Sequence, residues 1–180
     1  MNQGKIIFLN GVSSSGKSTL SNELVKMMPS YFHISIDDFD IFIDRMEDRK
    51  NNHLIPVETG YFFHRTIAMF SDKGVNLVVD HILNDDFTRE DCFKVLSDYP
   101  VLFVGVHCPM EELDRRGKAR EDRNIGQAKE QLEYVHKSEI YDIEINTFLE
   151  GVDENSNKVI EALNNAEYQN GWLHTSKNLK

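Results

Sequence analysis

Short apolar runs alternate with longer stretches of mixed polarity along the chain. The runs are almost continuously apolar, which is typical of strands whose two faces are both covered by helices. The strands predicted from these runs span residues 5–10, 32–36, 75–80, 100–108 and 143–147. Apolar residues at helical spacing predict helices after Pro109 and over residues 19–28, 39–49, 58–73, 87–97, 126–137 and 155–166. The alternation predicts an α/β fold of three layers around a parallel sheet.

The domain organisation is expected to be simple. The sequence shows neither an internal repeat nor a linker-like stretch, so we expect residues 1–180 to form a single domain. A chain of this length can enclose a hydrophobic core. The segment 168–180 is mostly polar, and we expect it to be a loose C-terminal tail.

Composition and charge limit the partners. Thirty acidic residues against twenty basic ones give a formal net charge of −10, so we expect no nucleic acid as a partner. The first apolar run, residues 6–9, is too short for a signal peptide core or a membrane span. Cys92 and Cys108 lack CxxC spacing. We therefore expect a cytoplasmic protein without a membrane partner, and the sequence leaves its oligomeric state open.

Residues 11–18 match the phosphate-binding pattern G-x-x-x-x-G-K-[ST] between a predicted strand and a predicted helix. Glycines let the chain wrap until backbone N–H groups face the phosphates, and the helix N-terminus adds positive charge. Lys17 is long enough to reach the β- and γ-phosphates, and the Ser18 hydroxyl suits Mg²⁺. We therefore expect ATP and Mg²⁺ as cofactors, whereas the competing interpretation is a serine-rich turn with an exposed lysine. The predicted nucleotide-binding residues are Gly11, Val12, Ser13, Ser14, Ser15, Gly16, Lys17, Ser18 and Thr19.

Two carboxylates stand at the ends of predicted strands. Because the carboxyl ends of parallel strands share one edge, Gly11, Asp37, Asp80 and Cys108 are expected to lie on one rim. Asp37 is a candidate catalytic base that accepts the proton of an acceptor hydroxyl, or a partner of Mg²⁺. Asp80 is a candidate metal-site residue that orients Mg²⁺ through water. The competing interpretation is that Asp37 or Asp38 caps the next helix, and that Asp80 is a strand-end cap.

Basic residues gather in one segment. Residues 115–123 contain five basic residues in nine positions. Pairs with i,i+4 spacing explain part of this cluster: Glu111–Arg115, Glu112–Arg116 and Asp114–Lys118. Arg120 and Arg123 fall outside these pairs, and Gly117 and Gly126 could act as hinges. We expect a lid over about residues 115–127 in which the two arginines contact the transferring phosphoryl group; the competing interpretation is a solvated charged face.

Taken together, these segments resemble one known family. The motifs GVSSSGKST, KAREDRNIGQA (118–128), YVH (134–136) and YDIEINT (141–147) are similar to those of the chloramphenicol phosphotransferase-like P-loop kinases. The resemblance covers about residues 5–147. It implies a nucleoside-monophosphate-kinase-like fold with a five-stranded parallel sheet, and ATP- and Mg²⁺-dependent transfer of the γ-phosphoryl group to a small-molecule hydroxyl. It also implies specific roles: nucleotide binding by Lys17 and Ser18, catalysis by Asp37, and lid contacts from Arg120 and Arg123.

The acceptor is left open by the sequence. Residues 40–65, where the acceptor should bind, differ from the chloramphenicol enzyme, and His81 and Asn146 stand where the family has acidic residues. Aromatic residues near this segment either line an acceptor pocket or belong to the core: Phe39, Phe42, Tyr61, Phe62 and Phe63.

We expect a kinase for a small hydroxylated compound, including antibiotics such as chloramphenicol. The alternatives are a nucleoside or nucleotide kinase and a non-catalytic nucleotide-binding switch. A nucleotide kinase would need an arginine-rich monophosphate site, and the segment around residues 40–65 offers only Arg45, Arg49 and Arg65. A GTPase-type switch would need an NKxD motif, which the sequence lacks.

Overall fold

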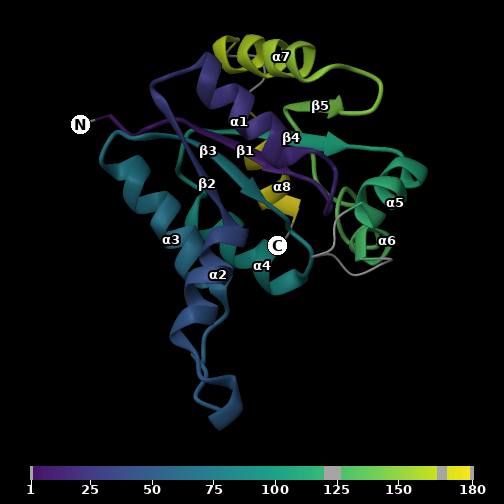
Figure 1. The fold of residues 1–180 in the computed structure, drawn as a ribbon. Helices are drawn as coiled ribbons and strands as arrows, with labels where there is room; N and C mark the ends of the chain where they lie inside the picture. The colour runs from purple at the N-terminus through teal and green to yellow at the C-terminus, as the bar shows by residue number, and fades with distance from the viewer. Residues whose placement is uncertain (1, 120–126, 166–169, 179–180) are drawn as a thin grey trace.

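The computed structural model describes residues 2–119, 127–165 and 170–178. Its strands form one parallel sheet with the order β2-β3-β1-β4-β5 (Figure 1). The strands are β1 (Ile6–Asn10), β2 (Tyr31–Ser35), β3 (Asn76–His81), β4 (Val101–His107) and β5 (Ile143–Asn146). The predicted α/β fold with a parallel five-stranded sheet is confirmed, and each predicted strand is present with its ends shifted by at most one residue.

Helices cover both faces of the sheet. The helical segments are α1 (Lys17–Met27), α2 (Ile36–Met46), the 3₁₀ turn η1 (Arg49–Asn51), α3 (Thr59–Asp72), α4 (Asp86–Val95), α5 (Met110–Lys118), α6 (Gln127–Gln131), α7 (Val152–Asn164) and α8 (Gly171–Asn178). Helices α1 and α7 pack together on one face, while α3, α4 and α8 cover the other (Figure 1).

The two faces of β1 show why the strands read as continuous apolar runs. Ile6 and Phe8 join the core under α3, α4 and α8, whereas Ile7 and Leu9 join the core under α1 and α7. All four side chains are fully buried. Since alternate side chains of a strand point to opposite faces, a sheet covered on both sides needs apolar residues at every position.

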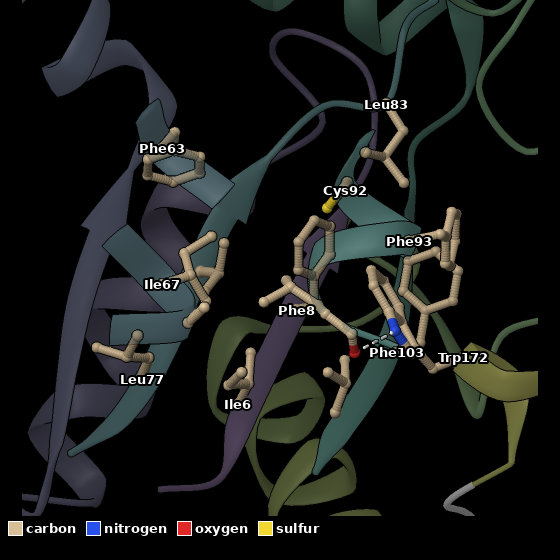
Figure 2. Close-up of a cluster of buried hydrophobic side chains, with 14 of the residues drawn as sticks. Ile6, Phe8, Phe63, Ile67, Leu77, Leu83, Cys92, Phe93, Phe103 and Trp172 are labelled. Carbon is tan, nitrogen blue, oxygen red and sulfur yellow. Dashed lines mark hydrogen bonds between the residues drawn. The ribbon is translucent and has the colours of Figure 1, made fainter. Parts of the chain in front are cut away.

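The C-terminal segment is not the loose tail expected from its polarity. Residues 171–178 form α8, and its Trp172 is only 2% exposed. The indole ring lies against Phe93, with 4.1 Å between ring centroids, and against Phe8 and Phe103 (Figure 2). Its Nε1 donates a hydrogen bond of 3.0 Å to the Leu96 carbonyl oxygen. The expectation of a loose tail is therefore wrong for residues 171–178, because one large apolar side chain anchors a polar helix.

The helix predicted over residues 126–137 is also corrected. Its described part, α6, ends at Gln131, and turns follow as far as His136. His136 has a positive φ of 72°, a left-handed conformation that cannot continue a helix. The apolar spacing of this segment instead places Leu132 and Val135 on a small core cluster with Val12 and Leu113.

A narrow arm projects from the body of the molecule. It consists of α2, η1 and the chain that leads into α3 (Figure 1). A β-bridge between Asp48 and His53 closes the tip of the arm. The arm carries exposed apolar side chains, including Phe42 at 59% exposure, while Phe63 at the base of α3 is fully buried. The aromatic residues near the expected acceptor site therefore divide between surface and core.

None of the helices in the described ranges combines the length and apolar character that crossing a membrane would require.

Candidate active site

The phosphate-binding loop occupies the predicted position, between β1 and α1. Gly16 caps α1 with φ of 100°, and Ser14 has φ of 65°. A side chain at Gly16 would be strained at this φ. At Gly11 a Cβ atom would lie 2.5 Å from the Val106 carbonyl oxygen, so the close approach of the loop to β4 requires glycine. The chain therefore wraps around an N-terminal helix end, which is the geometry that binds phosphate.

Lys17 folds back over the loop. Its Nζ donates hydrogen bonds to the carbonyl oxygens of Gly11, at 2.9 Å, and Val12, at 3.2 Å. The same atom lies 3.7 Å from Asp80 Oδ1, and the Lys17 side chain is only 10% exposed. The alternative of a serine-rich turn with an exposed lysine is therefore excluded. The cation is held at the loop by two backbone carbonyl oxygens and by the Asp80 carboxylate.

Ser18 and Asp80 meet beside this lysine. Ser18 Oγ donates a hydrogen bond of 2.7 Å to Asp80 Oδ2, and Asp80 is 5% exposed. Hydroxyl and carboxylate oxygens are ligands that Mg²⁺ prefers, and Mg²⁺ usually retains waters and phosphate oxygens around one or two protein groups. The pair fits such an ion. Within the described ranges, no three His, Cys, Asp or Glu side chains gather in a way that could hold a metal ion.

Asp37 lies in the first turn of α2, one position into the helix rather than at the end of the strand. Its backbone N–H donates to Ser35 Oγ at 3.2 Å, so Ser35 caps the helix and the Asp37 carboxylate is not needed for that role. The Asp37 side chain lines the cavity that also contains Lys17, Ser18 and Asp80. Three predicted site residues thus share one cavity with the candidate base.

This first cavity has a volume of about 350 Å³ and extends from the loop to α2, α3 and α4. Its walls are largely polar. The residues that line it include Ser13, Ser14, Gly16, Lys17, Ser18, Thr19, Ile36, Asp37, Asp40, Glu58, Thr59, Gly60, Asp80, His81, Asn84, Asp85, Thr88 and Gln131. A molecule bound in this cavity would contact the loop on one side and the arm on the other.

A second cavity, of about 360 Å³, lies on the opposite side of the loop. Leu20, Arg116, Thr147 and Asn155 contribute to its walls, and it shares Ser14, Gly16 and Thr19 with the first cavity. The remaining predicted loop residues are enclosed: Val12 and Ser15 are each 1% exposed. Cys108 follows β4 but packs against the small cluster around Val12.

Arg116 connects α5 to the phosphate-binding loop and to the residue that follows β5, at the wall of the second cavity. It donates to Thr147 Oγ1 at 3.0 Å and to the Ser14 carbonyl oxygen at 3.4 Å. Glu112 accepts from both Arg115 and Arg116 at 2.7 Å, and these hydrogen bonds lower the pKa of Glu112 to about 2. The predicted Glu112–Arg116 pair is confirmed, while Arg115 pairs with Glu112 at i,i+3.

The predicted lid is described only in part. Residues 115–118 are the last turn of α5, so Gly117 lies inside a helix. Arg120 and Arg123 lie outside the described residues. Beyond them, Gln131 of α6 reaches the loop: its Oε1 accepts a hydrogen bond of 2.7 Å from the Ser13 backbone N–H. The side-chain amide oxygen of Gln131 therefore accepts from a backbone N–H group that would otherwise be available to a phosphate oxygen.

A chain of hydrogen bonds runs from the partly exposed Arg65 through Asp91 and His64 to His81, which lines the first cavity. Arg65 binds both carboxylate oxygens of Asp91, at 2.9 and 3.0 Å. Asp91 lies 2.7 Å from His64 Nδ1, and His64 Nε2 lies 3.0 Å from His81 Nε2. Burial lowers the pKa of His64, and burial together with His64 and Lys17 holds the pKa of His81 well below its usual value. Both imidazoles are therefore neutral near pH 7.

Sequence reasoning missed several of these residues. Arg116 was expected only as an ion-pair partner, and Gln131, His64 and Asp91 carried no motif. Their contacts join positions far apart in the chain, such as Gln131 with Ser13, so no local spacing could reveal them. His81 did stand out as a departure from the family, which was the available signal.

The fold and the loop define a P-loop kinase. A family model for chloramphenicol phosphotransferase-like proteins matches residues 4–164, and the chain therefore belongs to this family. Rv2636 of Mycobacterium tuberculosis (strain H37Rv), a predicted O-phosphotransferase, is 28% identical over 93% of this chain and 86% of its own length.

Solved kinases share the fold. A sugar kinase from Janibacter sp. HTCC2649 has a TM-score of 0.67 and 18% identity, covering 91% of this chain and 96% of the other. The Mycobacterium tuberculosis APS kinase CysC, in complex with AMPPNP and APS, has a TM-score of 0.65 and 18% identity, covering 92% and 100%. The family and the fold make this chain a nucleotide-binding kinase with a small-molecule phosphate acceptor.

Proposed function

We propose that the protein transfers the γ-phosphoryl group of ATP to a hydroxyl group of a small molecule. The observation that carries this proposal is the pair of cavities on opposite sides of one phosphate-binding loop. Such an arrangement suits a nucleotide that enters from one side and an acceptor that meets its terminal phosphate from the other.

The nucleotide is assigned to the loop and the second cavity. In this proposal residues 11–19 surround the phosphates with backbone N–H groups, and Lys17 contacts the β- and γ-phosphates. The adenosine end lies beside Leu20, Arg116 and Thr147, which line the second cavity. Binding requires that Gln131 release the Ser13 N–H, because a phosphate oxygen needs the same donor.

Mg²⁺ is assigned to Ser18 and Asp80, the hydroxyl and carboxylate that already lie 2.7 Å apart. When bound, the ion would neutralise charge on the phosphate oxygens. Asp80 also keeps Lys17 in place, since its other oxygen lies 3.7 Å from Lys17 Nζ.

Asp37 is assigned as the base. Its carboxylate orients the acceptor hydroxyl and accepts the hydroxyl proton. The acceptor oxygen then forms a bond to the γ-phosphorus, while the bond to the β–γ bridging oxygen breaks and ADP leaves with that electron pair. Arg120 and Arg123, by resemblance to the family, contact the transferring phosphoryl group. We place this ATP-dependent reaction in the cytoplasm and assign no nucleic acid to it.

The acceptor class includes antibiotics, because the chain belongs to a family described by chloramphenicol phosphorylation. Chloramphenicol is therefore the reference acceptor in a screen of small alcohols and antibiotics. The readout is an ATP-dependent mass gain of one phosphoryl group on the acceptor. A complete absence of both ATP binding and transfer in the folded protein would refute the proposal.

Lys17→Ala tests the assignment of the loop. We expect transfer to fall about a hundredfold or more, because a cation that meets the phosphate charge is lost. Lys26→Ala is the matched control, since Lys26 lies on the same helix with its side chain 75% exposed. Near-native turnover in Lys17→Ala would contradict the proposed role of the loop.

A further inference from the structure

The first cavity is strongly acidic on the side away from the loop. Asp37 and Asp40 of α2, Glu58 before α3 and Asp85 before α4 all line it. Among the described lining residues, Lys17 is the one Lys or Arg, and its Nζ is held by the loop carbonyls and Asp80. A molecule bound on this side therefore meets negative charge.

The carboxylates on the arm side lie close enough to influence one another. Burial is the main cause that raises the pKa of Asp40, and the charges of Asp37, Asp44 and Glu58 raise it further. A hydrogen bond with Thr59 acts in the opposite direction. Unlike Asp85, whose Oδ1 accepts from Thr88 N–H at 2.7 Å, the Glu58 side chain does not cap its helix. Asp40 and Glu58 thus form a like-charged pair, and a bound cation would reduce the electrostatic repulsion between them.

A second observation comes from the bottom of the same cavity. His81 lines it and is 2% exposed, and its buried Nδ1 has no hydrogen-bond partner within the described protein. Buried polar atoms are normally satisfied, so an orphaned one indicates a missing ligand or water.

The hydrogen-bond chain fixes what this orphaned atom can do. The Asp91 carboxylate accepts from His64 Nδ1–H, so the neutral His64 presents an unprotonated Nε2. His64 Nε2 must then accept from His81 Nε2–H, which leaves His81 Nδ1 with a lone pair. His81 Nδ1 is therefore an acceptor, like the carboxylates of the cavity that His81 lines, and it suits the N–H or O–H donors of a ligand.

We infer that the acceptor is a cationic amino polyol, such as an amino sugar or an aminocyclitol. Its ammonium group binds to Asp40 and Glu58, and His81 Nδ1 accepts a hydrogen bond from one of its N–H or O–H groups. The hydroxyl to be phosphorylated then faces Asp37 and the loop. This inference rests on the proposed function and narrows its substrate class; an anionic acceptor such as the APS of the mycobacterial kinase would be repelled by this wall.

The test compares free amines, which are cationic, with their uncharged N-acetyl derivatives. Glucosamine is measured against N-acetylglucosamine, and 2-deoxystreptamine against its di-N-acetyl derivative. Binding to the full chain with AMPPNP and saturating Mg²⁺ is followed by calorimetry at fixed ionic strength. Saturating Mg²⁺ excludes simple competition between the amine and the metal. We expect each free amine to bind at least about tenfold more tightly than its acetylated partner.

Two variants locate the ammonium site. Asp40→Asn and Glu58→Gln should each weaken binding of the amines about three- to tenfold and leave the acetylated compounds unchanged. Glu161→Gln on α7 is the control, because it removes one charge from an exposed site on the opposite face of the sheet. Comparison with Glu161→Gln distinguishes a local contact with the ammonium group from the long-range attraction that any protein with a net charge of −10 exerts on a cation. Thermal melts confirm that each variant is folded.

The outcomes separate this inference from the proposed function. If neither amine binds more tightly than its acetylated partner, or if Glu161→Gln weakens binding as much as Asp40→Asn, the ammonium site is wrong. Transfer of phosphate to neutral or anionic alcohols alone would also overturn it, while the proposed kinase activity would stand. Failure to bind AMPPNP would instead remove the proposed function, and the inference with it.

Discussion

At the scale of single residues, Asp37 illustrates how one position can support two interpretations. A carboxylate at the start of a helix is either a cap or a reactive group. The cap is assigned to Ser35 by its hydrogen bond, and the Asp37 side chain lines the cavity beside Lys17. The geometry therefore favours the reactive role that we propose.

Asp37→Asn tests that role. We expect normal binding of ATP and Mg²⁺ but a loss of roughly a hundredfold to ten-thousandfold in kcat, because asparagine cannot accept the hydroxyl proton. Asp38→Asn is the matched control, since Asp38 is its exposed neighbour in the same helical turn. Rapid-mix turnover and nucleotide affinity are measured for both. Full activity in Asp37→Asn, or an equal loss in Asp38→Asn, would remove Asp37 from catalysis.

His136 predicts how stability depends on pH. Burial, with His107 and Lys17 nearby, lowers the pKa of His136 to about 3. In the unfolded chain the imidazole takes up a proton below about pH 6.5. The unfolded state therefore binds more protons between pH 6.5 and 3, and the stability present above pH 6.5 decreases as the pH falls through this window. Between pH 7 and 5 we expect a loss of up to about 2 kcal/mol from this group.

The matched variant is His136→Asn. Asparagine tolerates the positive φ of 72° at this position and does not titrate. Urea unfolding at pH 7 and pH 5 should show a smaller loss of unfolding free energy in the variant than in the parent protein. Other buried histidines contribute in the same direction, so the difference between the two proteins is the quantity that matters. Equal losses would show that His136 does not titrate on unfolding in this range.

At the scale of elements, the helix α8 shows where sequence patterns fail. Strand positions were predictable because apolar residues occupy both faces of every central strand, which is a strong local signal. The helix α8 has no such periodic pattern, since most of its residues are polar and only Trp172 gives it a large buried side chain. Its position depends on packing against Phe93 of α4 and Phe103 of β4, which no local pattern describes.

The same limit applies to the candidate site. The loop residues and Asp80 were predictable because their spacing and strand-end position have a direct physical meaning. The contacts of Gln131 with Ser13 and of Arg116 with Thr147 were not, because they depend on how distant elements pack. The roles expected for Arg120 and Arg123 stay predictions.

Trp172→Ala tests the contribution of α8. Removing a buried indole that packs against three phenylalanine rings should lower the free energy of unfolding by about 3–5 kcal/mol. Leu173→Ala is the control, because that side chain is 45% exposed and its loss should cost far less. Denaturant unfolding of both variants provides the comparison. A similar small effect in both would mean that α8 contributes little to the core.

At the scale of the whole molecule, the sheet order places the loop-bearing strand β1 between β3 and β4. The first cavity lies toward β3 and the arm, and the second toward β5 and α5. In the proposed assignment, nucleotide and acceptor are bound at the same time, one in each cavity, with the phosphates on the loop that both cavities share. Direct transfer then needs no phosphorylated form of the enzyme.

Steady-state kinetics test this arrangement. With both substrates varied, we expect intersecting lines in double-reciprocal plots, because transfer takes place within a ternary complex. Incubation with radiolabelled ATP alone should leave the protein unlabelled. Parallel lines together with a labelled side chain would indicate a covalent phosphoenzyme and would contradict direct transfer.

The packing of Trp172 also has a consequence for the order of events during synthesis. Phe8 is made 164 residues before Trp172, yet their ring centroids lie 5.0 Å apart. At roughly 5–20 residues per second, a ribosome needs about 10 to 30 s to make the chain between them. From the time each is made until Trp172 follows, the aromatic faces of Phe8, Phe93 and Phe103 lack their covering indole. The nascent chain therefore exposes this apolar surface until residue 172 has been made, and exposed apolar surface of this kind is what chaperones bind.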